Sequence, residues 1–370
     1  MKKKTVVGQL LRLLQLLIVP VIYYLTRVAS KVPEIVETVY SNGVYPVIRN
    51  AVSAFTRLFP FSLVEYMACF LAVLFAVIFF VRFVRLLKMK EDSFVKLLSF
   101  IISLVLFAGY LFSAFYIMWG FNYFRPSVDK KLGLPNGEYT KEELYEVCLD
   151  LAEHAKELRE KVTVNTSGVF CGDLDRMQTA VQKAYSDFGA TRPDFKADVP
   201  PAKALLSSEY FSQRGISGIY IFLTEEPNIN VNEPFLYIPF SAAHETAHYL
   251  GYAREEDASF IAFLVCRDSE DAYVAYSGYM HALVNCGNAL AGMDMDLYSA
   301  LRSTYSAGMD ADFADYSEYY NKYKDTEEFK ASNDMNDSYL KFNDQPKGVA
   351  SYEEDVLLIL RLYDSERFFS

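Results

Sequence analysis

His244-Glu245-Thr246-Ala247-His248 is the part of this sequence from which the rest of the chain can be interpreted. On a helix, His244 and His248 are four residues apart and project from the same face. Two imidazoles at this spacing can bind one zinc ion, and Glu245 then lies beside the open coordination position. The pattern therefore predicts His244 and His248 as metal ligands and Glu245 as a catalytic acid–base. The alternative is a solvated amphipathic helix that happens to carry two histidines.

A zinc site of this kind needs a third protein ligand. The run Glu255-Glu256-Asp257-Ala258-Ser259 resembles a pattern of the gluzincin metallopeptidases, ExxA(D/N). In that pattern a Glu lies three residues before an Ala, and an Asp or Asn follows the Ala directly. The resemblance implies Glu255 as the third ligand, with Glu256 as the alternative if the turn is one residue longer. Ser259 replaces the Asp or Asn that commonly orients a ligand histidine in that group. The competing interpretation of Glu255 is a surface carboxylate near a helix start, where negative charge is favoured.

The residues around the motif predict its local structure. Pro234–Phe240 is a short apolar run that is typical of a strand. Ser241 stands where the N-cap of the motif helix is expected, because its hydroxyl can accept a free backbone N–H. Gly251 suits the end of that helix.

Composition and charge divide the chain in two. The hydrophobic share is 52% and the aromatic share 16%, values that favour membrane segments over a wholly soluble protein. Residues 1–120 carry 13 Lys and Arg against 5 Asp and Glu, whereas residues 121–370 carry 23 against 42. Such an acidic second part argues against nucleic acid as a partner, because phosphate binding needs a basic surface. The five cysteines form no CxxC pair, and most are predicted to be buried thiols.

Three apolar runs in the first part predict transmembrane helices, at about residues 9–28, 66–83 and 97–119. The first is interrupted by polar residues and by Pro20, so it is either a span or an uncleaved signal anchor. The basic residues before the first run and between the second and third are expected on the cytoplasmic side. Residues 121–370 are then extracytoplasmic, and the chain is a multi-pass protein of the cell membrane whose first partner is the lipid bilayer.

The second part is expected to be mainly helical, with a small β element. Lys141–Val162 and Leu174–Phe188 are predicted helices, and His154 lies on the solvated face of the first. Ile216–Leu223 suits a strand, which Thr224–Val231 interrupts. Within this region, Ile219–Asn230 is the candidate edge that binds an extended peptide through main-chain hydrogen bonds, and a packing hairpin is the equal alternative.

Metallopeptidases usually supply a Tyr or His that donates a hydrogen bond to the developing oxyanion. Tyr276, Tyr279 and His281 are candidates by position, because they lie on a predicted helix beyond the motif. For each of them, packing in the core or at its rim is the competing interpretation.

Taken together, these residues resemble a family of uncharacterised bacterial membrane proteins that is catalogued as a domain of unknown function and whose members are similar to metallopeptidases. The matching stretches are Trp119–Pro126, Glu226–Asn230, Pro239–Phe260, Tyr276–Tyr279, Asn336–Lys341 and Tyr352. The resemblance implies an anchored zinc hydrolase and names no substrate.

The sequence thus predicts a membrane region at residues 1–120 with three spans, and a zincin-like domain at residues 121–370. The expected function is zinc-dependent hydrolysis of a peptide or protein substrate, in which Glu245 moves the proton. The alternative is an inactive envelope module that binds a partner and keeps the zincin fold. Proteolysis inside the membrane is disfavoured, because Tyr249–Asp257 is too polar for a span.

Overall fold

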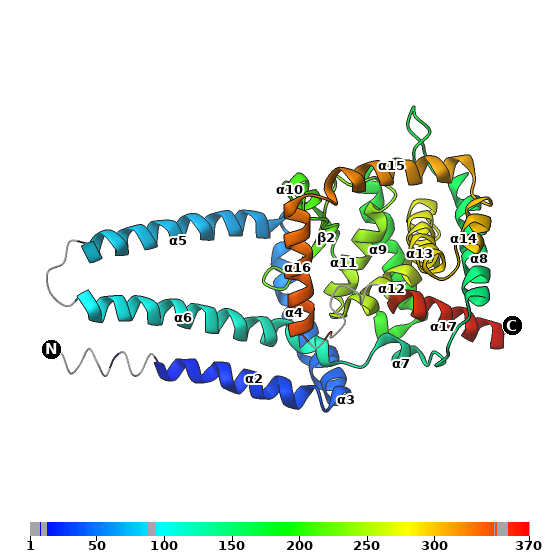
Figure 1. Cartoon of the computed structure of the whole chain (residues 1–370). Helices are drawn as coiled ribbons and strands as arrows, with labels where there is room; N and C mark the ends of the chain where they lie inside the picture. The colour runs from blue at the N-terminus through cyan, green and yellow to red at the C-terminus, as the bar shows by residue number, and fades with distance from the viewer. Residues whose placement is uncertain (1–7, 9–12, 88–92, 344, 346–353, 370) are drawn as a thin grey trace. The chain divides into compact units, whose positions relative to one another are not determined.

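The structure is a computed structural model that describes residues 8, 13–87, 93–343, 345 and 354–369 (Figure 1). It is mainly helical and contains a small sheet, as expected from the sequence. The chain divides into two compact units. The first comprises Met1–Thr56, Leu63–Arg125 and Phe222–Thr224, and the second comprises Arg57–Ser62, Pro126–Ile221 and Glu225–Ser370. The boundary expected after residue 120 lies close to Arg125.

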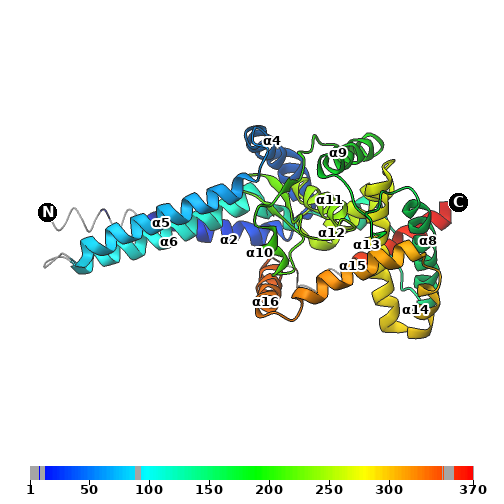
Figure 2. The ribbon, with the colours of Figure 1, turned by 90° about the horizontal axis from the view of Figure 1, so that it is seen from above.

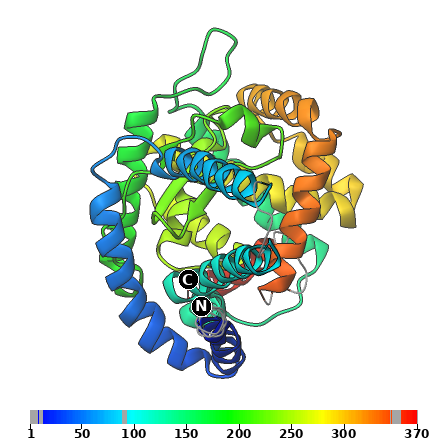
Figure 3. The ribbon, with the colours of Figure 1, turned by 90° about the vertical axis from the view of Figure 1, so that its left-hand side faces the viewer.

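The first unit consists of helices. They are η1 (Gln15–Leu17), α2 (Ile18–Ala29), α3 (Pro33–Ile35), the π-helical η2 (Val36–Val44), α4 (Tyr45–Thr56), α5 (Leu63–Leu87), α6 (Ser93–Met118) and η3 (Gly120–Phe124). The two long helices α5 and α6 run in opposite directions, and Figure 3 views them nearly end-on. The rings of Phe79 in α5 and Phe100 in α6 are in contact, with 6.0 Å between their centroids.

Two helices of this unit are long and apolar enough to cross a membrane, over Leu63–Val81 and Leu97–Met118. They match the second and third predicted spans. The first predicted span corresponds to η1 and α2, which pass the same test only together with Pro33–Thr56, across a bend of 109°. Two or three such helices are consistent with a membrane protein. Residues 9–12 of the first run lie outside the described part of the chain.

The structure does not describe the side chains of the basic residues from which the orientation was predicted. Lys2, Lys3, Lys4, Lys88 and Lys90 lie outside the described residues. The same holds for the side chains of Arg82, Arg85 and Lys96, and for Tyr352 near the end of the chain.

The second unit has helices α7 to α17 and the sheet (Figure 2). Its helices are α7 (Val128–Leu132), α8 (Lys141–Arg159), α9 (Leu174–Thr191), η4 (Pro193–Phe195), α10 (Ser208–Ser212), α11 (Ile238–Tyr249), α12 (Glu255–Arg267), α13 (Ala272–Met293), α14 (Met295–Arg302), α15 (Ala307–Tyr323), α16 (Glu327–Phe342) and α17 (Glu354–Phe369). Helices α11, α12 and α13 are buried along most of their length and form the centre of the core.

Helix α8 shows why the local pattern was sufficient for its prediction. Its N-cap Thr140 accepts from the backbone N–H of Glu143, whose side chain accepts from the N–H of Thr140 in return. This capping box fixes the start of the helix. Its apolar residues Leu144, Val147 and Leu151 are buried at helical spacing. The predicted helix over Leu174–Phe188 is likewise present as α9.

The sheet has the order β1 (Lys203–Ala204), β3 (Glu226–Ile229), β2 (Gly218–Ile221). Strand β1 pairs in parallel with β3, and β2 pairs antiparallel with β3. The predicted strand at Ile216–Leu223 is therefore present as β2, and it lies at an edge of the sheet. The region expected to interrupt it contains the central strand β3, so that part of the prediction was wrong.

The structure also corrects two predictions ahead of the motif. Pro234–Phe240 forms no strand: it is a turn that continues into α11, which begins at Ile238. Ser241 is consequently inside the helix, and Tyr237 takes the N-cap position. Pro239 explains the earlier start, because proline fits the first turn of a helix, where no partner for its missing N–H is needed.

Candidate metal centre

The candidate centre is built by two helices and the turn between them. Helix α11 presents His244 and His248 from one face, since they are four residues apart. The turn after α11 passes through Gly251, whose φ of 88° is a left-handed conformation that glycine adopts without strain. Glu255 then begins α12. The turn therefore folds the acid back onto the two histidines.

The three side chains converge on one point. Nε2 of His244 lies 3.2 Å from Oε2 of Glu255, and Nε2 of His248 lies 3.5 Å from the same oxygen. All three donor atoms are within 4.8 Å of one another. Ligands about 2.1 Å from a tetrahedral ion are about 3.4 Å apart, so this donor set fits a small divalent cation.

Each of the two imidazoles is oriented by a contact at its Nδ1 atom. Nδ1 of His248 lies 2.7 Å from the carbonyl oxygen of Tyr252, which can only accept, so Nδ1 carries the proton. Nδ1 of His244 lies 3.2 Å from Oγ of Ser259. Ser259 thus occupies the orienting place that the sequence pattern assigned to an Asp or Asn. These contacts leave Nε2 of each ring facing Glu255, as a ligand requires.

The electrostatics of the three groups are coupled. Burial alone would raise the pKa of Glu255, but the imidazoles of His248 and His244 hold it below its usual range. Burial opposes the charged form of His248, yet Glu255 raises the pKa of that imidazole to about 9. Glu255 is therefore ionised at neutral pH. A bound cation must displace the proton of His248, which makes the affinity for metal fall in acid.

Glu245 is adjacent in sequence to a ligand and is 6% exposed. Burial raises the pKa of its carboxyl group to about 8. Oε2 of Glu245 has no hydrogen-bond partner among the described residues. Strand β2 lies directly against this side chain, because a Cβ on Gly218 would come within 2.6 Å of Oε1. The edge strand β2, which is half-buried, and the carboxylate are thus side by side.

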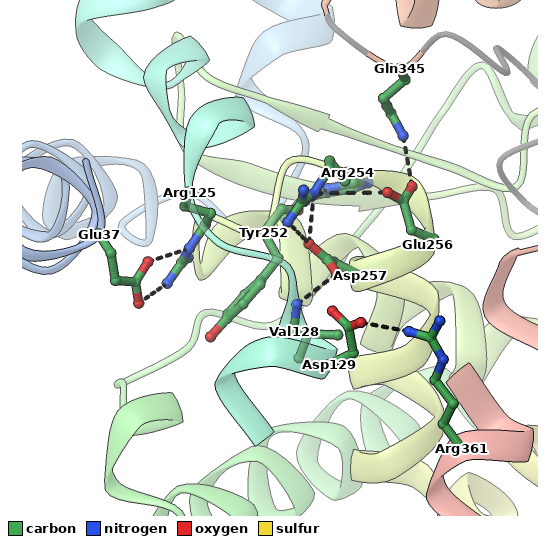
Figure 4. A network of polar contacts seen from close by, with 11 residues as sticks. Glu37, Arg125, Val128, Asp129, Tyr252, Arg254, Glu256, Asp257, Gln345 and Arg361 are labelled. Carbon is green, nitrogen blue, oxygen red and sulfur yellow. Dashed lines mark hydrogen bonds and ion pairs between the residues drawn. The ribbon is translucent and has the colours of Figure 1, made fainter. Parts of the chain in front are cut away.

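The alternative third ligand is held elsewhere. Oε2 of Glu256 accepts from Nε2 of Gln345 at 2.7 Å, and its other oxygen lies 3.8 Å from Nε of Arg254 (Figure 4). The structure therefore brings Glu255, rather than Glu256, to the two histidines.

A polar network fixes the start of α12 next to Glu255 (Figure 4). Asp257 accepts from Arg254 at 2.7 Å and from the backbone N–H of Val128 at 2.9 Å. Asp129, the next residue, is paired with Arg361 at 2.6 Å. These contacts connect α7, α12 and α17, so the position of Glu255 depends on residues far away in the sequence.

Two of the expected oxyanion donors have other partners. The hydroxyl of Tyr276 donates to Asp312 at 2.6 Å. The ring of Tyr279 stacks on His154 at 5.0 Å and meets Phe263 edge-on at 6.2 Å. His154 itself is about half exposed, in line with its predicted place on a solvated face. The catalytic roles of Tyr276 and Tyr279 stay predictions.

His281, the third candidate donor, lies nearer to the centre. Its ring stacks on Phe240 at 3.5 Å, and the ring of Phe240 is 6.4 Å from that of His244. Burial and the neighbouring His244 lower the pKa of His281 to about 3, so it is neutral over the physiological range.

One residue near the centre was not predicted from the sequence. The ring of Tyr220 in β2 is 6.5 Å from that of His248, and its hydroxyl donates to Glu225. Glu225 has a φ of 50°, which is uncommon for a residue other than glycine. The signal in the sequence was weak, because a tyrosine in an apolar strand is ordinarily a packing residue.

The fold and site define a helical protein with helices suited to a membrane and with a His–His–Glu donor set. The chain belongs to the family described as protein of unknown function (DUF3810), whose model matches residues 40–360. Neither the curated proteins nor the solved structures contain a significant match to it.

Proposed function

We propose that this chain is a membrane-anchored, zinc-dependent metallopeptidase whose second unit has a zincin-like arrangement and faces the extracytoplasmic space. The observation that carries the proposal is the convergence of His244, His248 and Glu255 within 4.8 Å, with Glu245 beside them. Zinc is favoured over magnesium or calcium, because imidazole nitrogen is a poor ligand for those hard cations.

The roles follow from the chemistry of each group. Zinc, when bound, would polarise the scissile carbonyl and increase the acidity of a water molecule. Glu245 would take a proton from that water and deliver it to the leaving amine. Its pKa of about 8 suits a group that holds the proton between these steps, and a cation at the triad would lower that pKa so that it can accept.

Strand β2 supports a peptide as the substrate. It is an edge strand of the sheet, the position at which an extended peptide can add through main-chain hydrogen bonds. The backbone of Tyr220 in this strand already bonds to Glu245. Gly218 brings the backbone of this strand against Glu245. A peptide bound along β2 would therefore have its main chain close to the groups proposed to cleave it.

The test uses the full-length protein in detergent. We expect about one zinc ion per chain in the wild type and in Glu245→Gln, and none in His248→Ala. Glu245→Gln should lose hydrolysis of a broad peptide library while keeping the metal. If neither the wild type nor Glu245→Gln binds zinc while both are folded, the proposal is wrong.

An inactive envelope module is the second candidate, and the ion pair between His248 and Glu255 favours it, since each of these two buried groups has a partner without a metal. The same assay separates the two. A wild type that is folded and binds zinc but cleaves no peptide, and that Glu245→Gln matches in every respect, would support the module.

A further inference from the structure

The inference concerns Pro33–Thr56, the helical segment formed by α3, η2 and α4 in the first unit. It follows α2 after a short break and turns away from the preceding helical stretch by 109°. Figure 3, which views α5 and α6 nearly end-on, shows this segment from the side. A helix that is roughly perpendicular to the candidate spans runs along a membrane surface if those helices cross the membrane.

The amphipathic pattern of α4 is the reverse of that of a helix in water. The residues on its inner face are mostly polar, and all are buried: Tyr45, Arg49, Ser53 and Thr56. The outer face is mostly apolar: the exposed residues of α4 are Val47, Ala51, Ala54 and Phe55, together with the polar Asn50. Val47 is 70% exposed.

Charge distribution agrees with this pattern. From Thr38 to Thr56 the only charged residue is Arg49, and its side chain is buried. An interfacial helix ordinarily presents its polar face to water and its apolar face to the acyl chains. Here the polar face is turned to the protein, so the apolar face is the one that meets the surroundings.

Three contacts fix the segment at the end of α6. The hydroxyl of Tyr40 donates to the carbonyl oxygen of Ile117 at 2.9 Å. Ser41 donates to Asn122 at 2.8 Å, and Glu37 pairs with Arg125 at 2.8 Å. The acceptor at Ile117 is in the last turn of a candidate span, and the other two partners follow that span directly. The segment is therefore at the level where a bilayer would end.

From these observations, we propose that Pro33–Thr56 lies in the membrane–water interface, with Val44, Val47 and Ala51 against the lipid acyl chains. Lipid is the occupant because the exposed apolar surface does not stop at α4. It continues along the chain at Val39 in η2, at Ile35 in α3 and at Val28 near the end of α2, within the same unit. A bilayer covers such a continuous surface. The inference is independent of the proposed peptidase activity.

The experiment places a single tryptophan on the outer face. Trp119 is the only tryptophan in the sequence, so Trp119→Phe gives a silent background for Val47→Trp and, as a second position, Ala51→Trp. Each full-length protein is reconstituted in phosphatidylcholine–phosphatidylglycerol vesicles whose acyl chains carry bromine at defined depths. Val73→Trp in α5 serves as the deep reference and Glu153→Trp in α8 as the aqueous reference.

Val47→Trp and Ala51→Trp should be quenched about twofold more by bromine near the headgroups than by bromine near the chain ends. Val73→Trp should show the opposite order, and Glu153→Trp should respond to neither. Equal or stronger quenching of both α4 positions by deep bromine would make the segment part of a span. Quenching of both by aqueous iodide alone would place the face in water. Either result overturns the inference.

Discussion

At the residue scale, the position of His244 depends on Ser259, whose hydroxyl lies 3.2 Å from Nδ1 of that ring. Groups behind a metal ligand typically contribute 10- to 100-fold in metal affinity. A neutral hydroxyl is a weaker partner than a carboxylate, so we expect Ser259→Ala to lower the affinity for zinc by about tenfold. The measurement is competition with a chromophoric chelator at constant pH.

Ser277→Ala is the matched control for this change. Ser277 is also buried; it donates to the carbonyl oxygen of Leu236 and accepts from the backbone N–H of Phe240, and neither bond involves His244. Its replacement should cost at least as much stability and leave the affinity for zinc unchanged. Equal affinities of Ser259→Ala and the wild type would show that His244 is oriented by other groups.

Glu233 gives a prediction for pH. Burial raises the pKa of its carboxyl group to about 7, although Ser217 donates a hydrogen bond that favours the charged form. The folded state therefore binds more protons than the unfolded state between pH 4.5 and 7, and stability falls as the pH rises through this window. Glu233→Gln should be about 2 kcal/mol more stable than the wild type at pH 8, and no more stable at pH 4.

Thermal midpoints at pH 4, 6 and 8 in the same detergent test this expectation. Glu270→Gln is the control, because Glu270 is a glutamate with an 83% exposed side chain. A constant difference between Glu233→Gln and the wild type at all three values would show that Glu233 is not protonated in the folded protein near neutral pH.

Spacing predicted His244 and His248 as neighbours, because one helical repeat determines that geometry. The resemblance to the gluzincin pattern supplied Glu255. Tyr220 could not be predicted as a neighbour of His248, since their proximity depends on how β2 packs against α11. The same holds for Tyr276, whose partner Asp312 is 36 residues away and on another helix.

At the scale of elements, one buried aspartate joins three parts of the second unit. Asp312 in α15 accepts from Arg159 in α8 at 2.6 Å, from Tyr276 in α13 at 2.6 Å and from the backbone N–H of Phe170 at 2.7 Å. The side chains of Arg159 and Asp312 are 8% and 0% exposed. Asp312→Ala should cost about 3–5 kcal/mol, because it leaves a buried guanidinium without its counter-charge.

The control lies two residues earlier on the same helix. Asp310 pairs with Arg302, but its side chain is 50% exposed, so Asp310→Ala should cost less than about 1 kcal/mol. Urea midpoints measure both.

Tyr276→Phe should cost only about 1 kcal/mol and keep hydrolysis, whereas a selective loss of hydrolysis would give Tyr276 a catalytic role.

Elements with a local start signal could be predicted, and those without one could not. Helix α8 begins at a capping box and repeats its apolar residues at helical spacing, so its bounds were close to those predicted. Pro234–Phe240 is buried on most sides in the folded chain, and a short apolar run has no period that separates a strand from a helix start. The short strand β3 was missed because it contains Pro227, which argues against a central strand, and because one of its two partners, β1, lies more than twenty residues earlier.

At the scale of the whole molecule, composition predicted the division into an apolar basic part and an acidic part. The two candidate spans were evident, because strongly apolar helical stretches of 19 and 22 residues have few alternatives. The first run was not decided by its sequence, since η1 and α2 pass the test for a span only together with Pro33–Thr56, across the bend. The prediction of the side of the membrane that the second unit faces rests on the distribution of charge alone.

The charge asymmetry makes that side testable. Cys69 and Cys171 are first replaced by serine, which leaves only the three buried thiols among the native cysteines. A single exposed cysteine is then introduced into this background by Glu153→Cys in α8. In cells with a permeabilised outer layer and an intact cell membrane, an impermeant maleimide should label Glu153→Cys. Lys90→Cys, in the basic connection between the candidate spans, should be labelled only after lysis, because positively charged loops remain in the cytoplasm. The reverse pattern would place the candidate metal centre inside the cell, where its substrate would have to be a cytoplasmic peptide.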